Sequence, residues 1–357
     1  MATIYCQSPS KPIHNVQPKS RLSSPVIAKV CVFKPRASVQ SQSLVIVTEP
    51  EPVFTSVKTF APATVANLGP GFDFLGCAVD GLGDHVTLHV DPTVRNGEIS
   101  ISEITGTTTK LSFNPHRNCA GIAAMATMKM LVIKSVGLSL ALHKGLPLGS
   151  GLGSSAASAA AATVAVNELF GRRLGNDELV LAGLESEAKV SGFHADNIAP
   201  AIMGGFVLIR SYEPLDLKPL RFPSEKDLFF VLVSPDFEAP TKKMRAALAK
   251  EIPMAHHVWN SSQAAALALS SDKVVEPKRA PLIPGMEVVK KAALEAGAFG
   301  CTISGAGPTA IAVIDTAEKG YEIGEKMVEA FLKVGNLKST ASVKKLDKVG
   351  ARLIRSM

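Results

Sequence analysis

Aromatic residues are scarce in this sequence. They make up 5% of its 357 residues, and there is a single tryptophan. Proteins that bind single-stranded nucleic acid without sequence preference stack bases on aromatic side chains, so this class is disfavoured. The composition is 46% hydrophobic and 19% charged, which provides enough apolar surface for a folded core. The length predicts two domains.

The sequence also lacks closely spaced cysteines. Cys6 and Cys31 lie near the N-terminus, and Cys77, Cys119 and Cys301 are far apart, so no CxxC pair occurs. Neither a disulfide framework nor a zinc site is predicted. The last three cysteines are expected to be buried thiols in a reducing compartment.

Acidic residues are missing from the first 48 positions, which hold six Lys or Arg. The rest of the chain carries 32 basic and 31 acidic residues, a net charge of +1, so nearly all of the net charge of +7 belongs to this leader and a nucleic-acid-binding body is disfavoured. A Ser-rich basic segment without a continuous apolar core is typical of an organelle transit peptide. We therefore expect residues 1–52 to be a transit peptide and linker, with the mature chain in the chloroplast stroma. A disordered basic tail is the alternative.

A charge-free stretch of 23 residues runs from Gly145 to Asn167. Its length suits a membrane span, but its first half is rich in Gly, Pro and Ser. Only residues 154–170 are predicted to be helical, and they are mostly alanine. A closely packed internal helix is therefore expected, and no membrane span.

Hydrophobic periodicity predicts strands and helices without regular alternation. We therefore expect an α+β fold of two domains, residues 53–215 and 216–357. The expected strands are 53–60, 85–90, 99–104, 138–142, 205–209, 229–233, 309–314 and 342–346; the expected helices are 118–136, 154–170, 177–189, 242–250, 258–269, 286–296 and 319–334.

The most informative motif is PLGSGLGSSAA at residues 147–157. Its glycines at alternate positions permit a ligand to approach the backbone, and the helix that begins at Ser154 or Ser155 directs its positive end to the same place. A phosphate group suits both features. The motif is neither a P-loop, because no lysine follows the glycines, nor a dinucleotide fingerprint, because the spacing is GxGxG.

Two further motifs accompany this loop: PATVANLGPGFDFLG at 62–76 and SGAGPT at 304–309. Together the three resemble the motifs of the GHMP kinases, which are ATP-dependent small-molecule kinases, and the resemblance covers 53–357. Within that superfamily, HADNIAP at 194–200 and EPKRAPLIPG at 276–285 resemble homoserine kinases. The leader is similar to those of the plant plastid members.

This resemblance implies a ribosomal protein S5 domain 2-like N-terminal domain that binds ATP and a ferredoxin-like C-terminal domain. It implies that L-homoserine is phosphorylated on its hydroxyl to O-phospho-L-homoserine, for threonine biosynthesis, with ATP as donor and Mg²⁺. A homodimer is the family expectation. The implied mechanism is positioning and charge stabilisation without an assigned general base, which suits a loose phosphoryl-transfer transition state.

The resemblance also implies roles for single residues around the amino-acid substrate. Asp73 would bind its ammonium, and Arg245 and Arg279 its carboxylate. Asn67 and Asn197 would lie near the reacting hydroxyl, so that Asn197, Asn67 and Arg245 form the catalytic set. His194 is a further substrate contact. Arg245 could instead be a solvated residue on a charged helix, and Asp196 is expected to point away from the site on an extended segment.

On the nucleotide side, the resemblance implies that the glycine-rich loop wraps the phosphates and that motif 304–309 supports it. Ser155 and Glu187 would hold Mg²⁺. The loop residues expected to bind ATP are Pro147, Leu148, Gly149, Ser150, Gly151, Leu152, Gly153, Ser154, Ser155, Ala156 and Ala157.

One segment departs from the homoserine kinase pattern. Residues 263–272 provide no room for the helical hairpin that these enzymes usually carry there, as though a segment had been excised. We expect Arg279 to reach its place by another path, and a misplaced substrate clamp can lower the rate about a hundredfold. Two alternatives therefore stay open: a sensor that binds ligands without turnover, and a kinase of the superfamily for another small alcohol.

Overall fold

The computed structural model describes residues 48–190, 192–221, 227–268 and 271–357. The predicted transit segment lies outside the described residues up to position 47. The described chain from residue 48 onward falls within one compact unit.

The first sheet is built around the long strand β2 (Leu75–Val90), and its described part has seven strands. β2 pairs antiparallel with β1 (Ser56–Ala66), β4 (Leu138–Lys144) and β5 (Phe206–Tyr212). All residues of β1 except Lys58 are buried, because both faces of this strand are covered. The remaining strands are β3 (Ile99–Gly106), parallel to β4; β6 (Leu215–Leu220), antiparallel to β5; and β11 (Arg352–Ser356), antiparallel to β1.

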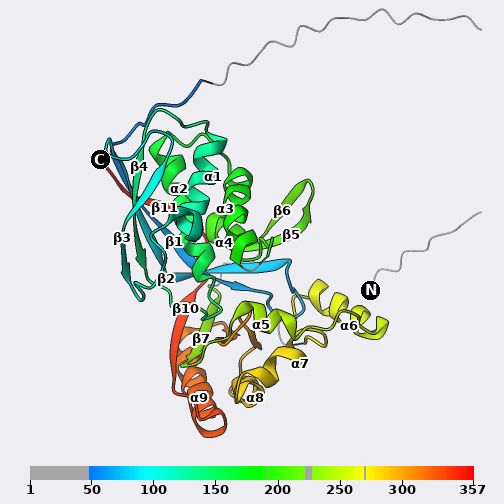
Figure 1. Cartoon of the computed structure of the whole chain (residues 1–357). Helices are drawn as coiled ribbons and strands as arrows, with labels where there is room; N and C mark the ends of the chain where they lie inside the picture. The colour runs from blue at the N-terminus through cyan, green and yellow to red at the C-terminus, as the bar shows by residue number, and fades with distance from the viewer. Residues whose placement is uncertain (1–47, 191, 222–226, 269–270) are drawn as a thin grey trace, which may run out of the picture. The chain divides into compact units, whose positions relative to one another are not determined.

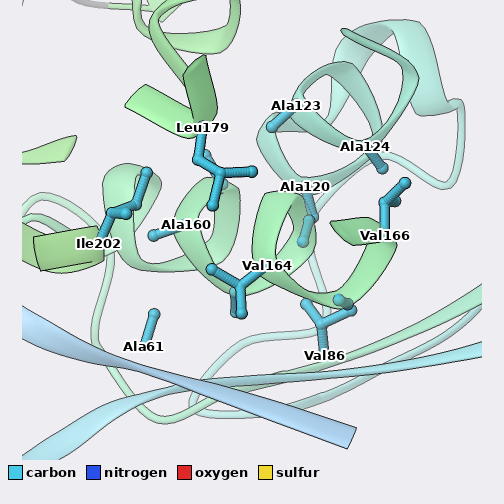
Figure 2. Packing of buried hydrophobic residues seen from close by; sticks show 14 of the residues in the cluster. Ala61, Val86, Ala120, Ala123, Ala124, Ala160, Val164, Val166, Leu179 and Ile202 are labelled. Carbon is cyan, nitrogen blue, oxygen red and sulfur yellow. The ribbon is translucent and has the colours of Figure 1, made fainter. Parts of the chain in front are cut away.

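Helices cover one face of this sheet (Figure 1). They are α1 (Cys119–Met130), α2 (Ser154–Leu169), α3 (Asn176–Val190) and α4 (Ile198–Met203), with a short 3₁₀ turn η1 (Pro115–Arg117) before α1. The alanine-rich α2 packs closely against its neighbours because its side chains are small. Its Val164 points toward the strands that carry Ala61 and Val86, and its Ala160 points toward Ile202 of α4 (Figure 2). Every residue of α2 except Ser155 is buried.

The second sheet is antiparallel and has the strand order β10–β7–β9–β8. Its strands are β7 (Phe229–Pro235), β8 (Gly300–Ile303), β9 (Ala310–Ile314) and β10 (Ser339–Lys345). The helices of this half are α5 (Thr241–Ala246), α6 (Met254–Ala265), α7 (Glu276–Arg279), α8 (Met286–Glu295) and α9 (Ala317–Gly335), with a 3₁₀ turn η2 (Ala280–Leu282). α8 and α9 bury apolar faces in the core of this half, through residues such as Val289 and Phe331.

A shared core joins the two sheets. Leu68 and Leu75 of the first motif and Leu152 of the glycine-rich loop belong to the same buried cluster as Phe230 and Ile311 of the second sheet. This cluster anchors both motifs where the two halves meet. It is the feature of the fold that positions the site.

The α+β fold is confirmed, with differences at particular elements. The first helix was predicted to reach residue 136 but ends at Met130, since Val132 adopts a left-handed φ of 58° and Ile133 N–H returns to the carbonyl of Met128. Strands β6, β8 and β11 were not predicted. β11 comes from the C-terminus and yet lies in the first sheet, beside β1. The division of the chain into two domains at residues 215/216 stays a prediction.

No helix within the described ranges combines the length and the apolar character that a membrane span requires.

Candidate active site

A cavity of about 400 Å³ lies where the three motifs meet. Segments that are far apart in the sequence supply its lining. Of the residues predicted for the site, those that line it are Asn67, Asp73, Leu148, Gly149, Ser150, Gly151, Gly153, Ser154, Ser155, Glu187, His194, Asn197, Arg245 and Arg279. The structure therefore brings nearly all of them together.

The glycine-rich loop requires its glycines. Gly149, Gly151 and Gly153 have φ values of 64°, 81° and 64°, a left-handed conformation that side chains with a Cβ disfavour. A Cβ on Gly153 would also collide with Thr64 and Asn197. Because Gly153 occupies the N-cap of α2 and offers no side-chain acceptor, the first N–H groups of the helix suit an anionic ligand.

The third motif braces this loop, as predicted. The Ser304 hydroxyl donates to the carbonyl of Gly151 at 2.6 Å, and the Thr309 hydroxyl donates to the carbonyl of Ser150 at 2.7 Å. A Cβ on Gly151 would come within 2.4 Å of the Ser304 carbonyl. The third motif therefore holds the loop at two successive residues, Ser150 and Gly151.

An acid and two arginines form the charged part of the cavity. The Arg245 guanidinium donates to both carboxylate oxygens of Asp73, at 2.8 and 2.9 Å, and this bonding raises the pKa of Arg245. Both Arg245 and Arg279 lie 5.1 Å from the ring centroid of Phe72. The aromatic ring thus contacts two like charges, an arrangement that cation–π attraction favours.

Arg279 is almost completely buried, with 2% of its surface exposed. Burial, aided by the nearby Arg245, lowers its pKa to about 10, which leaves it charged at neutral pH. It donates to the carbonyl of Gly305 at 2.8 Å, and its Nε has no hydrogen-bond partner among the described residues. A buried donor of this kind suits a carboxylate ligand.

The short link before α7 does not displace Arg279. Asp272 accepts the N–H groups of Val274 and Glu276 at 2.8 Å each and so begins the short helix. Glu276, buried at 5% exposure, accepts the N–H of Ile303 at 2.7 Å and is also bonded by Lys290 and Thr302. Arg279 lines the cavity together with Arg245, and these contacts, one set of them from Asp272 at the end of the link, hold the short helix that carries it.

The two asparagines have different surroundings. Asn67, at φ 72°, donates to the Gly305 carbonyl at 2.8 Å and accepts the N–H of Asp73 at 3.1 Å, so it ties the first motif to the third. Asn197 accepts the Thr64 hydroxyl at 2.8 Å through its carbonyl oxygen. This orients the amide nitrogen of Asn197 as the group that can donate to a ligand.

Asp196 also lines the cavity, contrary to the prediction that it points away. The reason is that Asn197 has helical φ and ψ at the start of α4, so the alternation of an extended strand does not apply. Burial raises the pKa of Asp196 to about 7, and the neighbouring Asp73 and Glu187 carboxylates add to the effect.

His194 lies beside the ion pair. Its Nδ1 is 3.5 Å from Asp73. Burial lowers its pKa and Arg245 acts in the same direction, whereas Asp73 opposes the shift. A neutral imidazole at neutral pH suits a hydrogen-bonding contact better than a charged one.

Ser155 and Glu187 fit the predicted Mg²⁺ site. Both line the cavity, where Ser155 is the one residue of α2 that is not buried and Glu187 is 4% exposed. Among the residues that the structure describes, no three His, Cys, Asp or Glu side chains gather into a metal site. Mg²⁺ usually takes one or two carboxylates together with substrate phosphates, so the Glu187 carboxylate and the Ser155 hydroxyl are of the right chemical kind for it.

Four predicted ATP contacts do not line the cavity. Leu152, Ala156 and Ala157 are buried in the hydrophobic core, since they lie on the inner side of the loop and of α2, and Pro147 lies on a neighbouring groove. Sequence reasoning missed other lining residues, among them Arg117, Lys144, Ser158 and Thr241. A signal existed for Lys144, which is the last charge before the 23-residue uncharged stretch.

The fold, with a glycine-rich anion loop and an ionic cluster in one cavity, defines a two-domain small-molecule kinase. The family model for the N-terminal domain of GHMP kinases matches residues 119–205, and the model for their C-terminal domain matches 254–333. The chain belongs to the homoserine kinases of the GHMP kinase family, as its relatives show.

A homoserine kinase of Arabidopsis thaliana is 80% identical over the full length of both chains. One of Chlorobium phaeovibrioides is 42% identical over 84% of this chain and 99% of its own. The crystal structure of a homoserine kinase from Cytophaga hutchinsonii has a TM-score of 0.79 at 38% identity, covering 85% of this chain and 99% of that one. The Arabidopsis alignment spans 371 positions against 357 residues, so the relative carries residues that this chain lacks.

Proposed function

We propose that this chain transfers the γ-phosphoryl group of ATP to the hydroxyl of L-homoserine. The observation that carries the proposal is one cavity with two kinds of binding surface: the loop at the N-terminus of α2, and the cluster of Asp73, Arg245 and Arg279. The first suits a phosphate chain. The second suits a zwitterion, which an α-amino acid provides.

On the amino-acid side, Asp73 receives the substrate ammonium, and Arg245 with Arg279 receives the carboxylate. This requires Arg245 to exchange one carboxylate, that of Asp73, for another. Asn197 donates to the hydroxyl that attacks phosphorus, while Asn67 holds Asp73 and the third motif in register.

On the nucleotide side, the phosphates are bound by backbone N–H groups of the loop and of the first turn of α2, among the residues that line the cavity: Gly149, Ser150, Gly151, Gly153, Ser154 and Ser155. Ser155 and Glu187 would hold Mg²⁺, and the ion would supply neutralisation of phosphate charge. Catalysis then consists of holding the hydroxyl and the phosphoryl group in line and stabilising charge, with no general base assigned.

The test is ADP release by the full chain with ATP, Mg²⁺ and L-homoserine. L-serine, mevalonate and galactose serve as parallel substrates, and Asn197→Ala and Arg279→Ala as variants. We expect turnover with homoserine alone and its loss in both variants. Homoserine binding without ADP release would instead indicate a sensor, and turnover of another alcohol would contradict the substrate assignment.

We further propose that the chain acts in the chloroplast stroma as a homodimer. The basic, acid-free leader supports the location. A fusion of residues 1–52 to a fluorescent protein tests the location, and sedimentation of the chain without that leader tests the dimer. A cytosolic fusion or a monomer would contradict the respective part.

A further inference from the structure

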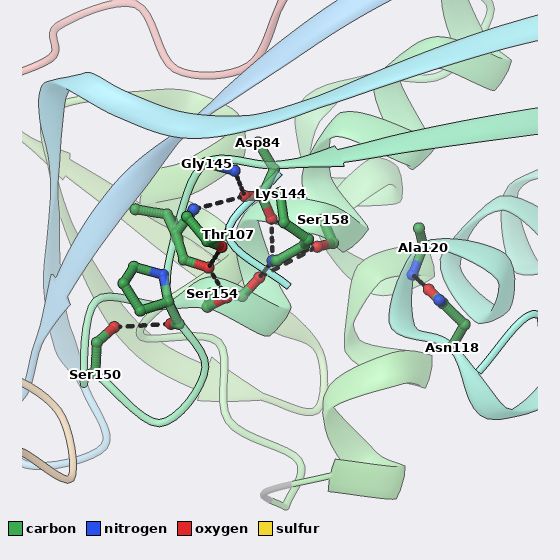
Figure 3. A network of polar contacts seen from close by, with 11 residues as sticks. Asp84, Thr107, Asn118, Ala120, Lys144, Gly145, Ser150, Ser154 and Ser158 are labelled. Carbon is green, nitrogen blue, oxygen red and sulfur yellow. Dashed lines mark hydrogen bonds and ion pairs between the residues drawn. The ribbon is translucent and has the colours of Figure 1, made fainter. Parts of the chain in front are cut away.

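A buried ion pair underlies the glycine-rich loop. Lys144 and Asp84 form it, with 1% and 0% of their side chains exposed. Lys144 stands at the end of β4 directly before the loop, and Asp84 belongs to the neighbouring strand β2. Figure 3 shows the pair at the centre of a polar network between the sheet and the start of α2.

Asp84 holds the entry of the loop. Its Oδ1 accepts the N–H of Gly145 at 2.9 Å and the N–H of Leu146 at 3.2 Å. Its Oδ2 accepts the hydroxyl of Ser158 at 2.6 Å as well as the ammonium of Lys144. One carboxylate oxygen thus holds the first residues of the loop, and the other bonds the side chains of Lys144 and Ser158.

Lys144 holds the exit of the loop. Its ammonium donates to the carbonyl of Ser154 at 2.7 Å and to the hydroxyl of Ser158 at 2.8 Å, in addition to Asp84. These three bonds use all three of its donors. Although Lys144 lies beside the cavity, it is therefore not free to bind phosphate in the way that a P-loop lysine does.

We propose that the Asp84–Lys144 pair is a positioning device that fixes the span of the phosphate loop, and so the affinity for the nucleotide. The proposal rests on the proposed nucleotide role of that loop. The pair joins Gly145 and Leu146 at one end to Ser154 at the other, and the intervening residues 147–153 contain the three glycines. A loop whose ends are fixed presents its N–H groups in a constant arrangement.

Two single variants with opposite changes of charge test this. Asp84→Asn leaves an extra positive charge near the phosphates, and Lys144→Met leaves an extra negative one. A purely electrostatic role predicts tighter nucleotide binding in the first and weaker binding in the second. A positioning role predicts that both raise the KM for ATP, by about tenfold to a hundredfold, with the KM for homoserine within about threefold of the wild type.

The double variant Asp84→Asn/Lys144→Met separates positioning from stability. It removes both buried charges, so most of the melting temperature lost in either single variant should return. The KM for ATP should stay raised, because the bond from Lys144 to the carbonyl of Ser154 at the far end of the loop stays lost. Recovery of both quantities, or opposite shifts in the two single variants, would overturn the proposal.

Asp347→Asn is the matched control. Asp347 is also buried, accepts two backbone N–H groups at 2.9 Å and pairs with Arg352, but it does not line the cavity. It should lower the melting temperature and leave the KM for ATP unchanged. Calorimetric titration with ADP and Mg²⁺ gives the same comparison without turnover, so a wild type that binds ADP but does not phosphorylate homoserine would contradict the proposed function alone.

Discussion

The phosphate side and the amino-acid side of the cavity differ in how their ion pairs are buried and bonded. Beneath the phosphate loop, Asp84 and Lys144 are completely buried and every polar atom of the pair is bonded to a fixed partner. At the amino-acid side, Asp73 and Arg245 are 25% and 33% exposed and bond to each other. The first arrangement is preorganised for a constant ligand, whereas the second must exchange partners with its ligand. Substrate selectivity should therefore depend on the second.

The largest loss of activity is expected at Gly153 of the phosphate loop, where an added side chain cannot be accommodated. Gly153→Ala introduces a Cβ that meets Thr64 and Asn197, at a φ of +64°. The start of α2 must then shift, and we expect kcat/KM for ATP to fall on the order of 10²–10³-fold.

Gly149→Ala is the control for this variant, since Gly149 has the same φ but no neighbour within 4 Å of an added Cβ. It isolates the backbone strain and should lower kcat/KM for ATP by about tenfold or less. Steady-state kinetics of both variants gives the two losses of kcat/KM for ATP. Equal losses would show that the backbone conformation, rather than steric crowding, controls the loop.

The next largest effect concerns substrate selectivity at the Asp73–Arg245 pair on the amino-acid side of the cavity. Substrates with one charge, 3-aminopropan-1-ol and 4-hydroxybutanoate, must break the Asp73–Arg245 pair while satisfying only one of its members. A partly buried charge left without its partner is unfavourable, so each should have kcat/KM about a hundredfold or more below that of homoserine.

In the double variant Asp73→Asn/Arg245→Gln this discrimination should collapse, because no ion pair remains to be broken. The ratio of kcat/KM for homoserine to that for each analogue measures it. An unchanged ratio would locate the selectivity elsewhere in the cavity.

The sequence predicted the motifs better than it predicted their supports. The glycines of residues 147–157 indicate an anion-binding loop, because glycines at alternate positions are seldom required except where a ligand closely approaches the backbone. The pairing of Asp84 with Lys144 could not be predicted, since it depends on the register of β2 with β4. The orientation of Asp196 was predicted wrongly because helix α4 begins two residues later. Phe72 was overlooked, since contact with two arginines arises only from tertiary structure.

Phe72 supports a smaller prediction on the amino-acid side. Phe72→Leu removes the ring that contacts Arg245 and Arg279 while keeping an apolar side chain. Cation–π contacts contribute about 0.5–1 kcal/mol each at partly exposed sites, so the loss of both should raise the KM for homoserine about five- to thirtyfold.

The values of kcat and of the KM for ATP should stay near those of the wild type, and Phe72→Tyr should restore the KM for homoserine. A loss that falls on both substrates equally would mean that the ring serves the fold rather than the arginines. Initial-rate measurements at varied homoserine and ATP distinguish these outcomes.

A pH-dependent effect on stability is expected at Asp196, which the charges of Asp73 on the amino-acid side and Glu187 on the nucleotide side both influence. Because burial raises the pKa of Asp196 from 3.8 to about 7, the folded chain keeps a proton that the unfolded chain releases. Folding is therefore penalised increasingly as the pH rises from about 4 to about 7, and fully above that.

Asp196→Asn removes this penalty, so it should raise the melting temperature at pH 8 more than at pH 5. At about 1.4 kcal/mol per pKa unit, the two gains differ by on the order of 2–3 kcal/mol, or several degrees. Thermal unfolding without nucleotide or Mg²⁺ measures it. Equal gains at both pH values, or a loss at pH 8, would mean that the Asp196 carboxylate is already ionised at pH 5 and is stabilised by the arginines of the exchanging part.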